Sequence, residues 1–503
     1  MTGAARSLSS LLRGAGIVPL ALSGGDPTIR SIAVDSRKAA PGTLFFALPG
    51  QRTSGEAFAP EAVARGAAAV LAPSPRPAAI EDGVAWVQVT APRLAAGRLA
   101  REWHGRPDEA LTLVGITGTN GKSTVAAMVE AIAAAAGLRA GRIGTVGIAV
   151  AGVERDSSRT TPESVDLFAT LAEMRDAGVT LVALEVSSHG LVQGRVEGAR
   201  FRVGTLLNLG RDHLDFHGTL EAYFDAKARL FEALSADDTA VLPADDPAGS
   251  RMAARTRARV VRFGRGTDAD VRLLDERGTL EASTARLETP WGRLRLTLTL
   301  PGKFNLDNAA AAAACALAAG LPPHAVERGI ASLSRVPGRL ERVEAGQPFS
   351  VFVDFAHTEQ ALRRVLGDLR PLVRGNLAVV IGCGGERDRG KRPGMGRAAA
   401  ELADRVVLTS DNPRGEDPLS ILHEMEAGVA EVPGAATRTE VVPDRSEAVR
   451  RAVTRSVEGD AVLVAGKGHE TTQTFADRVE KSDDRALVRQ ALAEMGWGRD
   501  ASA

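Results

Sequence analysis

A short segment rich in glycine and hydroxyl residues carries the clearest chemical signal of the sequence. It lies between an apolar run typical of a strand, Leu111–Ile116, and an alanine-rich run typical of a helix, Val125–Ala136. Glycines let backbone N–H groups turn toward a phosphate, and the N-terminus of the helix adds partial positive charge. The strict P-loop template requires a glycine at position 116, where this chain has isoleucine, and Gly115 lies one residue too early. The strand–loop–helix context nevertheless favours nucleotide binding over an ordinary glycine turn. The candidate nucleotide-binding residues are Gly118, Thr119, Asn120, Gly121, Lys122, Ser123 and Thr124.

Several side chains are expected to face the phosphates or a bound Mg²⁺. Lys122 supplies a compact positive charge for the terminal phosphates, and the Ser123 hydroxyl is a typical Mg²⁺ ligand. Glu185 closes an otherwise apolar run, where an acid is costly unless it is paired or metal-bound, and the neighbouring P-loop favours the metal over a buried salt bridge. His213 and His217 have the i,i+4 spacing of some zinc sites, but the glutamate of HExxH is absent. A polar wall for a Mg²⁺–nucleotide is therefore the favoured interpretation.

The elements that must position these residues alternate between strand-like and helix-like runs. This rhythm predicts the α/β fold class, with a parallel P-loop-type sheet in a central domain. A second doubly wound domain is expected after it and a smaller α/β domain before it. Residues 260–300 break the rhythm with alternating β-rich sequence, which predicts an antiparallel edge or a subdomain.

The last third of the chain repeats the pattern of polar residues after apolar strands. Its four predicted strands lead into Asp354–Thr358, Gly382–Arg389, Asp411–Arg414 and Gly466–Glu470. One polar strand end could be an ordinary cap, but four together indicate a ligand-binding face, because parallel sheets bind ligands beyond the carboxyl ends of their strands. The glycines of the second segment lack the spacing of a dinucleotide fingerprint, which excludes a dehydrogenase.

Composition limits the remaining function classes. The chain has 503 residues, with 62 Lys+Arg balanced by 62 Asp+Glu, so it lacks the cationic excess of a nucleic-acid binder. Two distant cysteines, Cys315 and Cys383, offer neither a disulfide framework nor a metal site. The longest uncharged apolar stretch, Ala309–Pro323, is too short to span a bilayer. The apolar run near the N-terminus is short and broken by a proline, so a signal peptide is not predicted.

Taken together, these motifs resemble those of the Mur ligases, the ATP-dependent amino-acid-adding enzymes of peptidoglycan synthesis. The resemblance runs from Asp35–Arg37 to Gly466–Glu470, nearly the whole chain. It implies a three-domain Mur ligase architecture: a UDP-sugar-binding N-terminal domain over 1–106, a central ATP-binding domain over 107–336, and a C-terminal amino-acid-binding domain over 337–503. The motifs that carry it are Gly118–Thr124, Thr160–Pro162, Glu185–Gly190 with Gln193 and Arg195, Asn208–Gly218, Asp354–Thr358 and Asp411–Arg414.

The resemblance also implies roles for individual residues. Lys227 falls where the family carries a carbamylated lysine, in which added CO₂ converts the cation into a carboxylate that can bind Mg²⁺. Asn308 and Arg339 would contact the adenosine part of ATP. The implied catalytic residues are Lys122, Lys227, His213 and Glu185, and the implied metal ligands are Ser123, Glu185, His213 and the Lys227 carbamate. The UDP-muramoyl-dipeptide is expected at Ser36, Gln51, Arg52, Thr53, Thr160, Thr161, Ser187, Gln193 and Arg195.

Within the family, the segment Asp411–Arg414 resembles the signature of members that add meso-diaminopimelate rather than lysine. Diaminopimelate has an extra carboxylate, which two arginines could bind as planar bidentate donors. The sequence departs from the family pattern at Phe355, where tyrosine is usual, and at Glu359, where proline is usual. The residues expected at diaminopimelate are Arg387, Asp411, Asn412, Pro413, Arg414, Gly466 and Glu470, the last as partner of the ammonium at its remote end.

The implied activity is ATP-dependent addition of meso-diaminopimelate to UDP-N-acetylmuramoyl-L-alanyl-D-glutamate through an acyl phosphate, with ATP and Mg²⁺ as cofactors. Small-molecule substrates, no nucleic acid, no membrane insertion, a cytoplasmic location and a monomeric state are expected. A lysine-adding ligase and a folylpolyglutamate-synthase-like ligase are the nearest alternatives. A GTPase switch is disfavoured because no asparagine is followed by lysine, as its base-reading motif requires. An ATPase module that drives a partner stays open.

Overall fold

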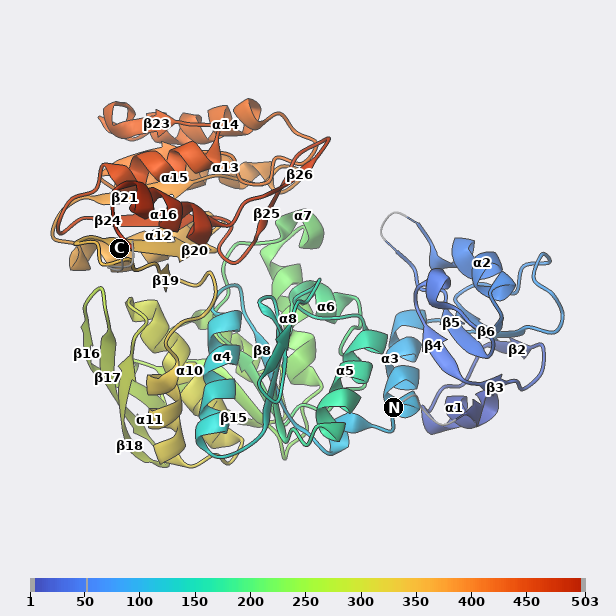
Figure 1. Cartoon of the computed structure of the whole chain (residues 1–503). Coiled ribbons are helices and arrows are strands. Elements are labelled where there is room, and N and C mark those ends of the chain that lie inside the picture. Colours follow the sequence, from blue (N-terminus) through green and yellow to red (C-terminus); the bar gives the residue numbers. More distant parts are fainter. Residues whose placement is uncertain (1–4, 51–52, 499–503) are drawn as a thin grey trace, which may run out of the picture.

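Three sheets, each packed against helices, follow one another along the chain in the computed structural model, which describes residues 5–50 and 53–498 (Figure 1). The N-terminal unit packs beside the central one through its last helix, and the C-terminal unit lies above the end of the central unit that carries the P-loop. This arrangement confirms the predicted α/β class with a central parallel sheet. Within the described part of the chain, none of the helices combines the length and apolar character needed to cross a membrane.

The N-terminal unit is a small five-stranded sheet with order β2-β7-β6-β5-β4, parallel except for the pairing of β2 with β7. Its central strands β5, β6 and β7 are short, largely apolar and mostly buried, which suits a parallel sheet. The sequence predicts strands at Ile32–Val34, Thr43–Leu48, Ala68–Leu71 and Trp86–Val89, which correspond to β4–β7 with small shifts at their ends, whereas β1–β3 were not predicted. The elements are β1 Arg6–Ser7, α1 Leu8–Gly14, β2 Ala21–Ser23, β3 Thr28–Ile29, β4 Ser31–Ala33, β5 Thr43–Phe46, α2 Ala59–Ala64, β6 Ala67–Ala72, β7 Ala85–Gln88 and α3 Pro92–Trp103.

The central sheet has eleven strands in the order β11-β10-β9-β12-β8-β13-β14-β15-β16-β17-β18. The strand that leads into the P-loop, β8 (Thr112–Thr117), lies between β12 and β13 and is parallel to both. The P-loop and the segments that contain Glu185 and His213 therefore follow the carboxyl ends of three neighbouring strands. The other elements are α4 Lys122–Ala135, β9 Ala140–Gly144, β10 Gly147–Val150, β11 Val153–Arg155, α5 Ser164–Asp176, β12 Leu181–Glu185, α6 Ser188–Val192, β13 Val203–Leu206, α7 Leu214–His217, α8 Leu220–Glu232, β14 Thr239–Pro243, α9 Pro247–Ala253 and β15 Arg259–Gly264.

The far edge of this sheet is antiparallel, as the alternating sequence over 260–300 predicts. The strands β16 Val271–Gly278, β17 Ser283–Thr289 and β18 Gly292–Leu298 pair in sequence order, and the helices α10 Lys303–Ala318 and α11 Pro323–Ser332 follow. The sequence predicts a helix over Asn308–Ala319, and α10 begins five residues before that range.

The C-terminal unit is a six-stranded sheet with order β19-β20-β24-β21-β22-β23, in which only β19 is antiparallel to its neighbour. Its four longer strands match the predicted ones, and each ends at the polar segment expected there. The elements are β19 Glu341–Arg342, β20 Ser350–Asp354, α12 Glu359–Leu369, β21 Leu377–Ile381, α13 Arg392–Leu402, β22 Arg405–Leu408, α14 Pro418–Ala430, β23 Thr439–Val441, α15 Arg445–Thr454, β24 Ala461–Ala465, β25 Thr472–Thr474, β26 Val479–Lys481 and α16 Asp484–Glu494.

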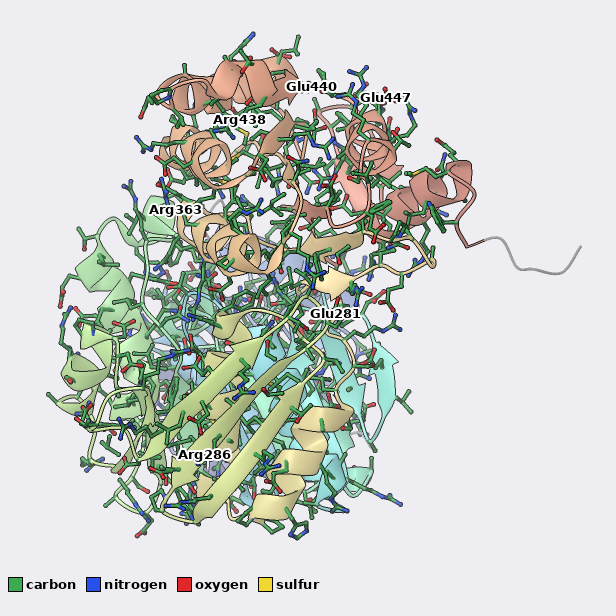
Figure 2. The ribbon with its side chains drawn as sticks, turned by 90° about the vertical axis from the view of Figure 1, so that its left-hand side faces the viewer. Glu281, Arg286, Arg363, Arg438, Glu440 and Glu447 are labelled. Carbon is green, nitrogen blue, oxygen red and sulfur yellow. The ribbon has the colours of Figure 1, made fainter. Side chains whose placement is uncertain are left out.

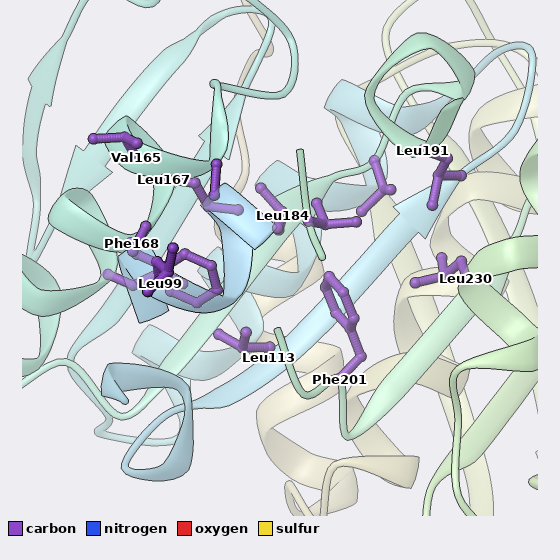
Figure 3. Close-up of a cluster of buried hydrophobic side chains, with 14 of the residues drawn as sticks. Leu99, Leu113, Val165, Leu167, Phe168, Leu184, Leu191, Phe201 and Leu230 are labelled. Carbon is purple, nitrogen blue, oxygen red and sulfur yellow. The ribbon is translucent and has the colours of Figure 1, made fainter. Parts of the chain in front are cut away.

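A continuous apolar core joins the N-terminal and central units (Figure 3). Leu99 of α3 and Phe168 of α5 are fully buried near Leu113 of β8 and Leu184 of β12. Burial of such a side chain contributes about 1.5–3 kcal/mol. Gly97 permits this close packing, because a Cβ atom there would lie 2.7 Å from the Glu197 carbonyl oxygen.

A helix cap joins the C-terminal unit to the central one. Helix α10 has no capping side chain of its own, but the Asp368 carboxylate of α12 accepts a hydrogen bond from the Phe304 amide at 2.8 Å. Asp307, one turn further along α10, pairs with Arg265 at 2.5 Å and with Arg364 of α12. Acidic groups at a helix N-terminus are stabilising. These contacts hold α12 against the helix that carries Asn308.

Charged side chains cover the outer faces of the molecule in pairs. Figure 2 shows Glu440 and Glu447 on the outer side of the C-terminal unit, where they pair with arginines of α15. On the antiparallel edge of the central sheet, Arg286 pairs with Asp275 at 2.9 Å. Exposed pairs of this kind contribute little individually to stability.

His104, at the end of α3, gives the fold a predictable dependence on pH. Burial, with the nearby positive charge of Arg175, lowers the pKa of His104 to about 4. The unfolded chain titrates near pH 6.5, so the stability contributed by the neutral ring is complete above pH 6.5 and is lost as the pH falls toward 4. We expect His104→Gln to flatten the decline of the unfolding free energy in this window by about 1–3 kcal/mol.

Denaturant titrations at pH 7, 5.5 and 4.5 measure this effect. The matched control is His324→Gln, because His324 is exposed at the start of α11. Identical pH slopes for the wild type and the His104 variant would contradict the assignment.

Candidate active site

The P-loop adopts the predicted strand–loop–helix geometry between β8 and α4. Gly118 and Gly121 have positive φ angles of 147° and 92°, and a Cβ atom on Gly121 would lie 2.4 Å from the Asn308 side-chain oxygen. Lys122 begins α4, and its Nζ donates hydrogen bonds to the carbonyls of Gly118 at 2.9 Å and Thr119 at 3.0 Å. Burial lowers the pKa of Lys122, against the opposing charges of Glu185 and Asp212. The lysine is held in its own loop, facing the acids of the neighbouring strand ends.

A cavity of about 290 Å³ lies above this loop, between the central and C-terminal units. It combines residues of the P-loop, of the ends of β12 and β13, of α10 and of the segment after β20. Most of the residues predicted for ATP and metal are therefore brought together. Among the predicted site residues, its wall contains Thr119, Asn120, Gly121, Lys122, Ser123, Thr124, Thr160, Glu185, Ser187, His213, Asn308 and Arg339.

Glu185 is fully buried at the end of β12 and is held by hydrogen bonds. Its carboxylate accepts bonds from the Thr145 amide at 2.9 Å and the Thr145 hydroxyl at 3.1 Å. Throughout residues 5–50 and 53–498, it forms an ion pair with no basic side chain, so the buried salt bridge that competed with the metal interpretation is wrong. Sequence reasoning missed Thr145, because the strand that it follows, β9, contains two glycines and an arginine and was not predicted.

His213 follows β13 in a left-handed conformation, with φ of 54°. Its Nε2 lies 3.5 Å from Asp212 Oδ2, and burial lowers the pKa of His213 to about 4. His217 points its Nε2 to the Ser188 hydroxyl at 3.0 Å. In the described part of the chain, no cluster of three or more His, Cys, Asp or Glu side chains could hold a metal ion without other ligands. Asp212, which lines the cavity, was not among the predicted site residues.

Lys227 is buried in α8 and does not line the cavity, but it lies within electrostatic reach of Lys122 and Asp212, which do. Its Nζ lies 4.3 Å from the centre of the Tyr223 ring. Burial, reinforced by the charge of Lys122 and opposed by that of Asp212, lowers the pKa of Lys227 well below its usual value. No carboxylate of the residues that the structure describes forms an ion pair with it. Burial therefore destabilises the ammonium form of Lys227 relative to that of an exposed lysine.

The residues predicted to hold the peptide end of the substrate form one hydrogen-bonded group. The Thr161 hydroxyl donates to the Glu185 carbonyl at 2.8 Å and contacts the Ser187 hydroxyl at 3.1 Å. Arg195 donates to the Thr161 carbonyl at 2.8 Å and to the Gln193 side chain at 2.7 Å. This group adjoins the cavity through Ser187, so the predicted peptide and nucleotide sites are continuous.

Glu163, which sequence reasoning missed, connects this group to the N-terminal unit. It pairs with Arg195 at 3.1 Å and with Arg93 of α3 at 3.2 Å. Arg93 also donates to the Pro49 carbonyl at 2.8 Å, beside the segment predicted to bind the UDP-sugar. The indication in the sequence that could have identified Glu163 is its place directly after the Thr160–Pro162 motif.

The predicted UDP-sugar residues are only partly described. The Ser36 hydroxyl is buried and donates to the Glu61 carboxylate at 2.7 Å, and Thr53 is exposed. The structure therefore places Ser36 at a fixed position in the N-terminal unit, away from the main cavity. Gln51 and Arg52 lie outside the described residues.

Arg339 connects the P-loop to the C-terminal unit. It lies in the segment between α11 and β19, and its Nη2 donates to the Ser123 hydroxyl at 3.1 Å. Its guanidinium also stacks 4.5 Å from the centre of the Phe355 ring. Phenylalanine at this departure from the family pattern thus supplies an aromatic face for the arginine.

Two arginines predicted to bind a carboxylate lie close together beyond the C-terminal sheet. Arg414 donates to the Gly385 carbonyl at 2.7 Å, and Arg387 donates to the Glu386 carbonyl at 3.2 Å. Burial and the charge of Arg387 lower the pKa of Arg414. Neither arginine forms an ion pair with a carboxylate inside the described ranges. Two neighbouring guanidinium groups without carboxylate partners form a receptor for an anion.

A buried ionic cluster supports this pair and was not found from the sequence. Arg392 is fully buried and donates to Glu416 at 2.9 Å and Glu424 at 3.0 Å. Glu416 in turn accepts the backbone N–H of Glu386, and its pKa is lowered to about 2 by the Arg392 hydrogen bonds. The cluster fixes the loop that carries Arg387 against the loop that carries Arg414.

The remaining predicted amino-acid residues lie around the same loops. Asn412 donates to the Glu470 carboxylate at 2.8 Å. Gly466 has a φ of 110°, and a Cβ atom there would lie 2.6 Å from the Asp411 carboxylate. Arg414 follows Pro413 and has a left-handed φ of 54°. The Glu470 carboxylate and the guanidinium groups of Arg387 and Arg414 thus lie in one region of the C-terminal unit.

Family models match three successive parts of the chain. The model described as Mur ligase family, catalytic domain matches residues 28–104, the Mur ligase middle domain matches 116–316, and the Mur ligase, glutamate ligase domain matches 338–468. The matches follow the three sheets in order.

Individual relatives align over almost the full length. UDP-N-acetylmuramoyl-L-alanyl-D-glutamate--2,6-diaminopimelate ligase of Solibacter usitatus is 44% identical over 483 residues, 95% of this chain and 96% of its own. The protein of that name from Geobacillus kaustophilus is 45% identical over 94% of this chain and 96% of its own. A solved structure of a protein with this name has a TM-score of 0.65 at 32% identity, over 93% of this chain and 96% of its own. A MurF structure from Acinetobacter baumannii, at 20% identity and a TM-score of 0.66 over 93% of this chain and 96% of its own, supports the fold alone. With this identity over nearly all of its length, the chain belongs to the Mur ligase family.

Proposed function

We propose that the chain catalyses the ATP-dependent addition of meso-diaminopimelate to UDP-N-acetylmuramoyl-L-alanyl-D-glutamate, an ADP-forming step of peptidoglycan precursor synthesis. The observation that carries the choice of amino acid is the pair of guanidinium groups of Arg387 and Arg414, with the carboxylate of Glu470 nearby. A remote end that bears both a carboxylate and an ammonium matches this arrangement, whereas lysine leaves the arginines without an anion.

The three units would divide the substrates among them. Residues 1–106 would bind the UDP-sugar, 107–336 ATP, and 337–503 the incoming amino acid. The cavity between the central and C-terminal units supports this division, because it combines P-loop residues with Arg339 and His357 of the last unit. We expect a cytoplasmic monomer that acts on small molecules.

The chemistry begins with attack of the substrate's γ-carboxylate on the ATP γ-phosphorus, which releases ADP and forms an acyl phosphate. Lys122 would neutralise phosphate oxygens as this charge moves. The diaminopimelate amine then attacks the acyl carbon, loses a proton, and the tetrahedral intermediate expels phosphate. Thr161, Ser187, Gln193 and Arg195 would orient the carboxylate, since they form one hydrogen-bonded group beside the cavity. The protein contributes chiefly positioning and electrostatics.

The residues at the cavity suit Mg²⁺. Ser123, Glu185 and His213 offer few ligands by themselves, as expected for an ion that takes much of its coordination from phosphate oxygens and water. A carbamate on Lys227 would add a carboxylate ligand. Bound there, the ion would withdraw negative charge from the phosphate oxygens.

Carbamylation requires a neutral amine, which burial of Lys227 favours. The Nζ lone pair would attack the carbon of CO₂ and form an N–C bond, while one C=O π pair moves to oxygen and the nitrogen loses a proton to water. The product carries a carboxylate at a position where the unmodified chain has an amine. The neighbouring cation Lys122 would then stabilise the new negative charge.

One assay tests the activity against its rivals. Purified protein is incubated with Mg²⁺, ATP and the UDP-dipeptide, with either diaminopimelate or lysine, and phosphate release and product mass are measured. We expect product only with all substrates and a strong preference for diaminopimelate. Preference for lysine would favour the lysine-adding alternative, and phosphate release that needs neither the UDP-dipeptide nor an amino acid would favour a pure ATPase.

A further inference from the structure

Lys467 is a buried cation that the chemistry above does not use. It lies just after β24, between Gly466 and Gly468, which have positive φ angles of 110° and 55°. Its side chain is 0% exposed, and its Nζ donates to the Thr472 carbonyl and lies 3.2 Å from Glu470 Oε2. A buried ammonium is costly unless it is paired and hydrogen-bonded. The ion pair with Glu470 therefore indicates the role of Lys467.

The Glu470 carboxylate is held on one side only. Its Oε2 atom receives Lys467 Nζ and also the Asn412 side-chain amide at 2.8 Å. Asn412 is itself oriented, because its Oδ1 accepts the Thr474 backbone N–H at 2.9 Å. Over the described ranges 5–50 and 53–498, no hydrogen bond reaches Glu470 Oε1. The side chain of Glu470 is 36% exposed, so a ligand can approach that second oxygen.

We propose that Lys467 is a positioning residue that fixes the Glu470 carboxylate so that its second oxygen accepts the remote ammonium of the incoming amino acid. This inference rests on the proposed function. Lys467 and Asn412 hold one oxygen from the protein side, and the other receives no hydrogen bond from the described residues. Glu470 also lies close enough to Arg414 for its charge to act on that guanidinium. Glu470 then binds the ammonium of the remote end, and Arg387 and Arg414 bind its carboxylate, with Glu470 already held in position by the protein.

A double-mutant cycle separates this role from a general structural one. The four proteins are the wild type, Lys467→Met, Glu470→Gln and the double variant, compared by KM for diaminopimelate, KM for ATP and KM for the UDP-dipeptide. Lys467→Met is expected to raise KM for diaminopimelate about tenfold and to leave the other two within about twofold. In the Glu470→Gln background the same change should add less than about twofold, because residues acting through one contact are not additive.

Two further variants sharpen the comparison. Lys481→Met is the matched control, because Lys481 lies exposed on β26 of the same unit, and it should change no KM. Lys467→Gln keeps a hydrogen-bond donor without the charge and should fall between the wild type and Lys467→Met.

Each failure has a distinct meaning. Equal effects of Lys467→Met in both backgrounds would overturn the proposal, and so would joint loss of folding and ATP binding in both Lys467 variants, since the lysine would then serve the fold. If the wild type uses no diaminopimelate at all, the proposed function fails instead. If it uses diaminopimelate but the cycle is additive, only the positioning role fails.

Discussion

Replacement of Lys227 by arginine is expected to lower kcat by about 10²–10³-fold, the size of effect seen when one preorganised electrostatic group is lost. Arginine keeps the positive charge and much of the length but has no primary amine that could be carbamylated. The wild-type amine is buried against Tyr223, and its pKa is lowered by burial and by Lys122. The loss should therefore fall on the chemical step, with a smaller change in nucleotide affinity.

Steady-state kinetics and nucleotide binding measure this separation. Lys481→Arg is the control, because it makes the same change at an exposed position. Wild-type protein in CO₂-free buffer should lose activity and regain it with bicarbonate, whereas the Lys227 variant should respond to neither treatment. A Lys227→Arg protein with more than about a tenth of the wild-type kcat would contradict the carbamate.

Much of the fold could be predicted because its central strands are buried on both faces. Such strands read as continuous apolar runs, and the runs Leu181–Val186, Leu377–Ile381 and Ala461–Val464 match β12, β21 and β24 to within one residue. The hairpin β9–β10 with the adjoining β11 was not predicted. Its strands contain several glycines, and β11 is exposed, so neither an apolar run nor a strict alternation marks them.

The candidate site was predictable where a local motif carries the chemistry. The P-loop joins a strand to a helix within a few residues, so its geometry follows from the sequence. Thr145, Glu163 and Arg392 were missed because their partners lie on other elements, 40, 70 and 24 residues away in their contacts with Glu185, Arg93 and Glu416. Which polar side chains contact one another depends on the order of the strands in the folded sheets, and these residues' own segments do not reveal that order.

Glu185 shows how the structure resolves an ambiguity that sequence leaves open. An acid at the end of an apolar strand could be paired with a cation or could face a ligand. The Thr145 hydrogen bonds hold it without an ion pair, and Gly144 leaves room, since a Cβ atom there would lie 2.0 Å from Glu185 Oε1. The carboxylate thus lines the cavity without an ion-pair partner among the described residues.

Replacement of Arg414 by alanine should raise KM for diaminopimelate about 100-fold, since loss of one partner from a desolvated charge pair costs about 3 kcal/mol. The ATP site is built from other loops, so KM for ATP should stay within about twofold. Use of lysine, which lacks the remote carboxylate, should change little. The ratio of kcat/KM between the two amino acids should therefore collapse.

Two comparisons establish that the effect comes from recognition of a carboxylate. Arg414→Lys keeps a charge but loses the planar fork, so its KM for diaminopimelate should lie between those of the wild type and Arg414→Ala. Arg450→Ala is the control, because Arg450 is an exposed arginine of the same unit that pairs only with Glu447 among its neighbours in the described structure. Parallel losses of ATP and diaminopimelate use in Arg414→Ala would count against the assignment. The guanidinium of Arg414 would then support the loop through its bond to the Gly385 carbonyl rather than bind the substrate.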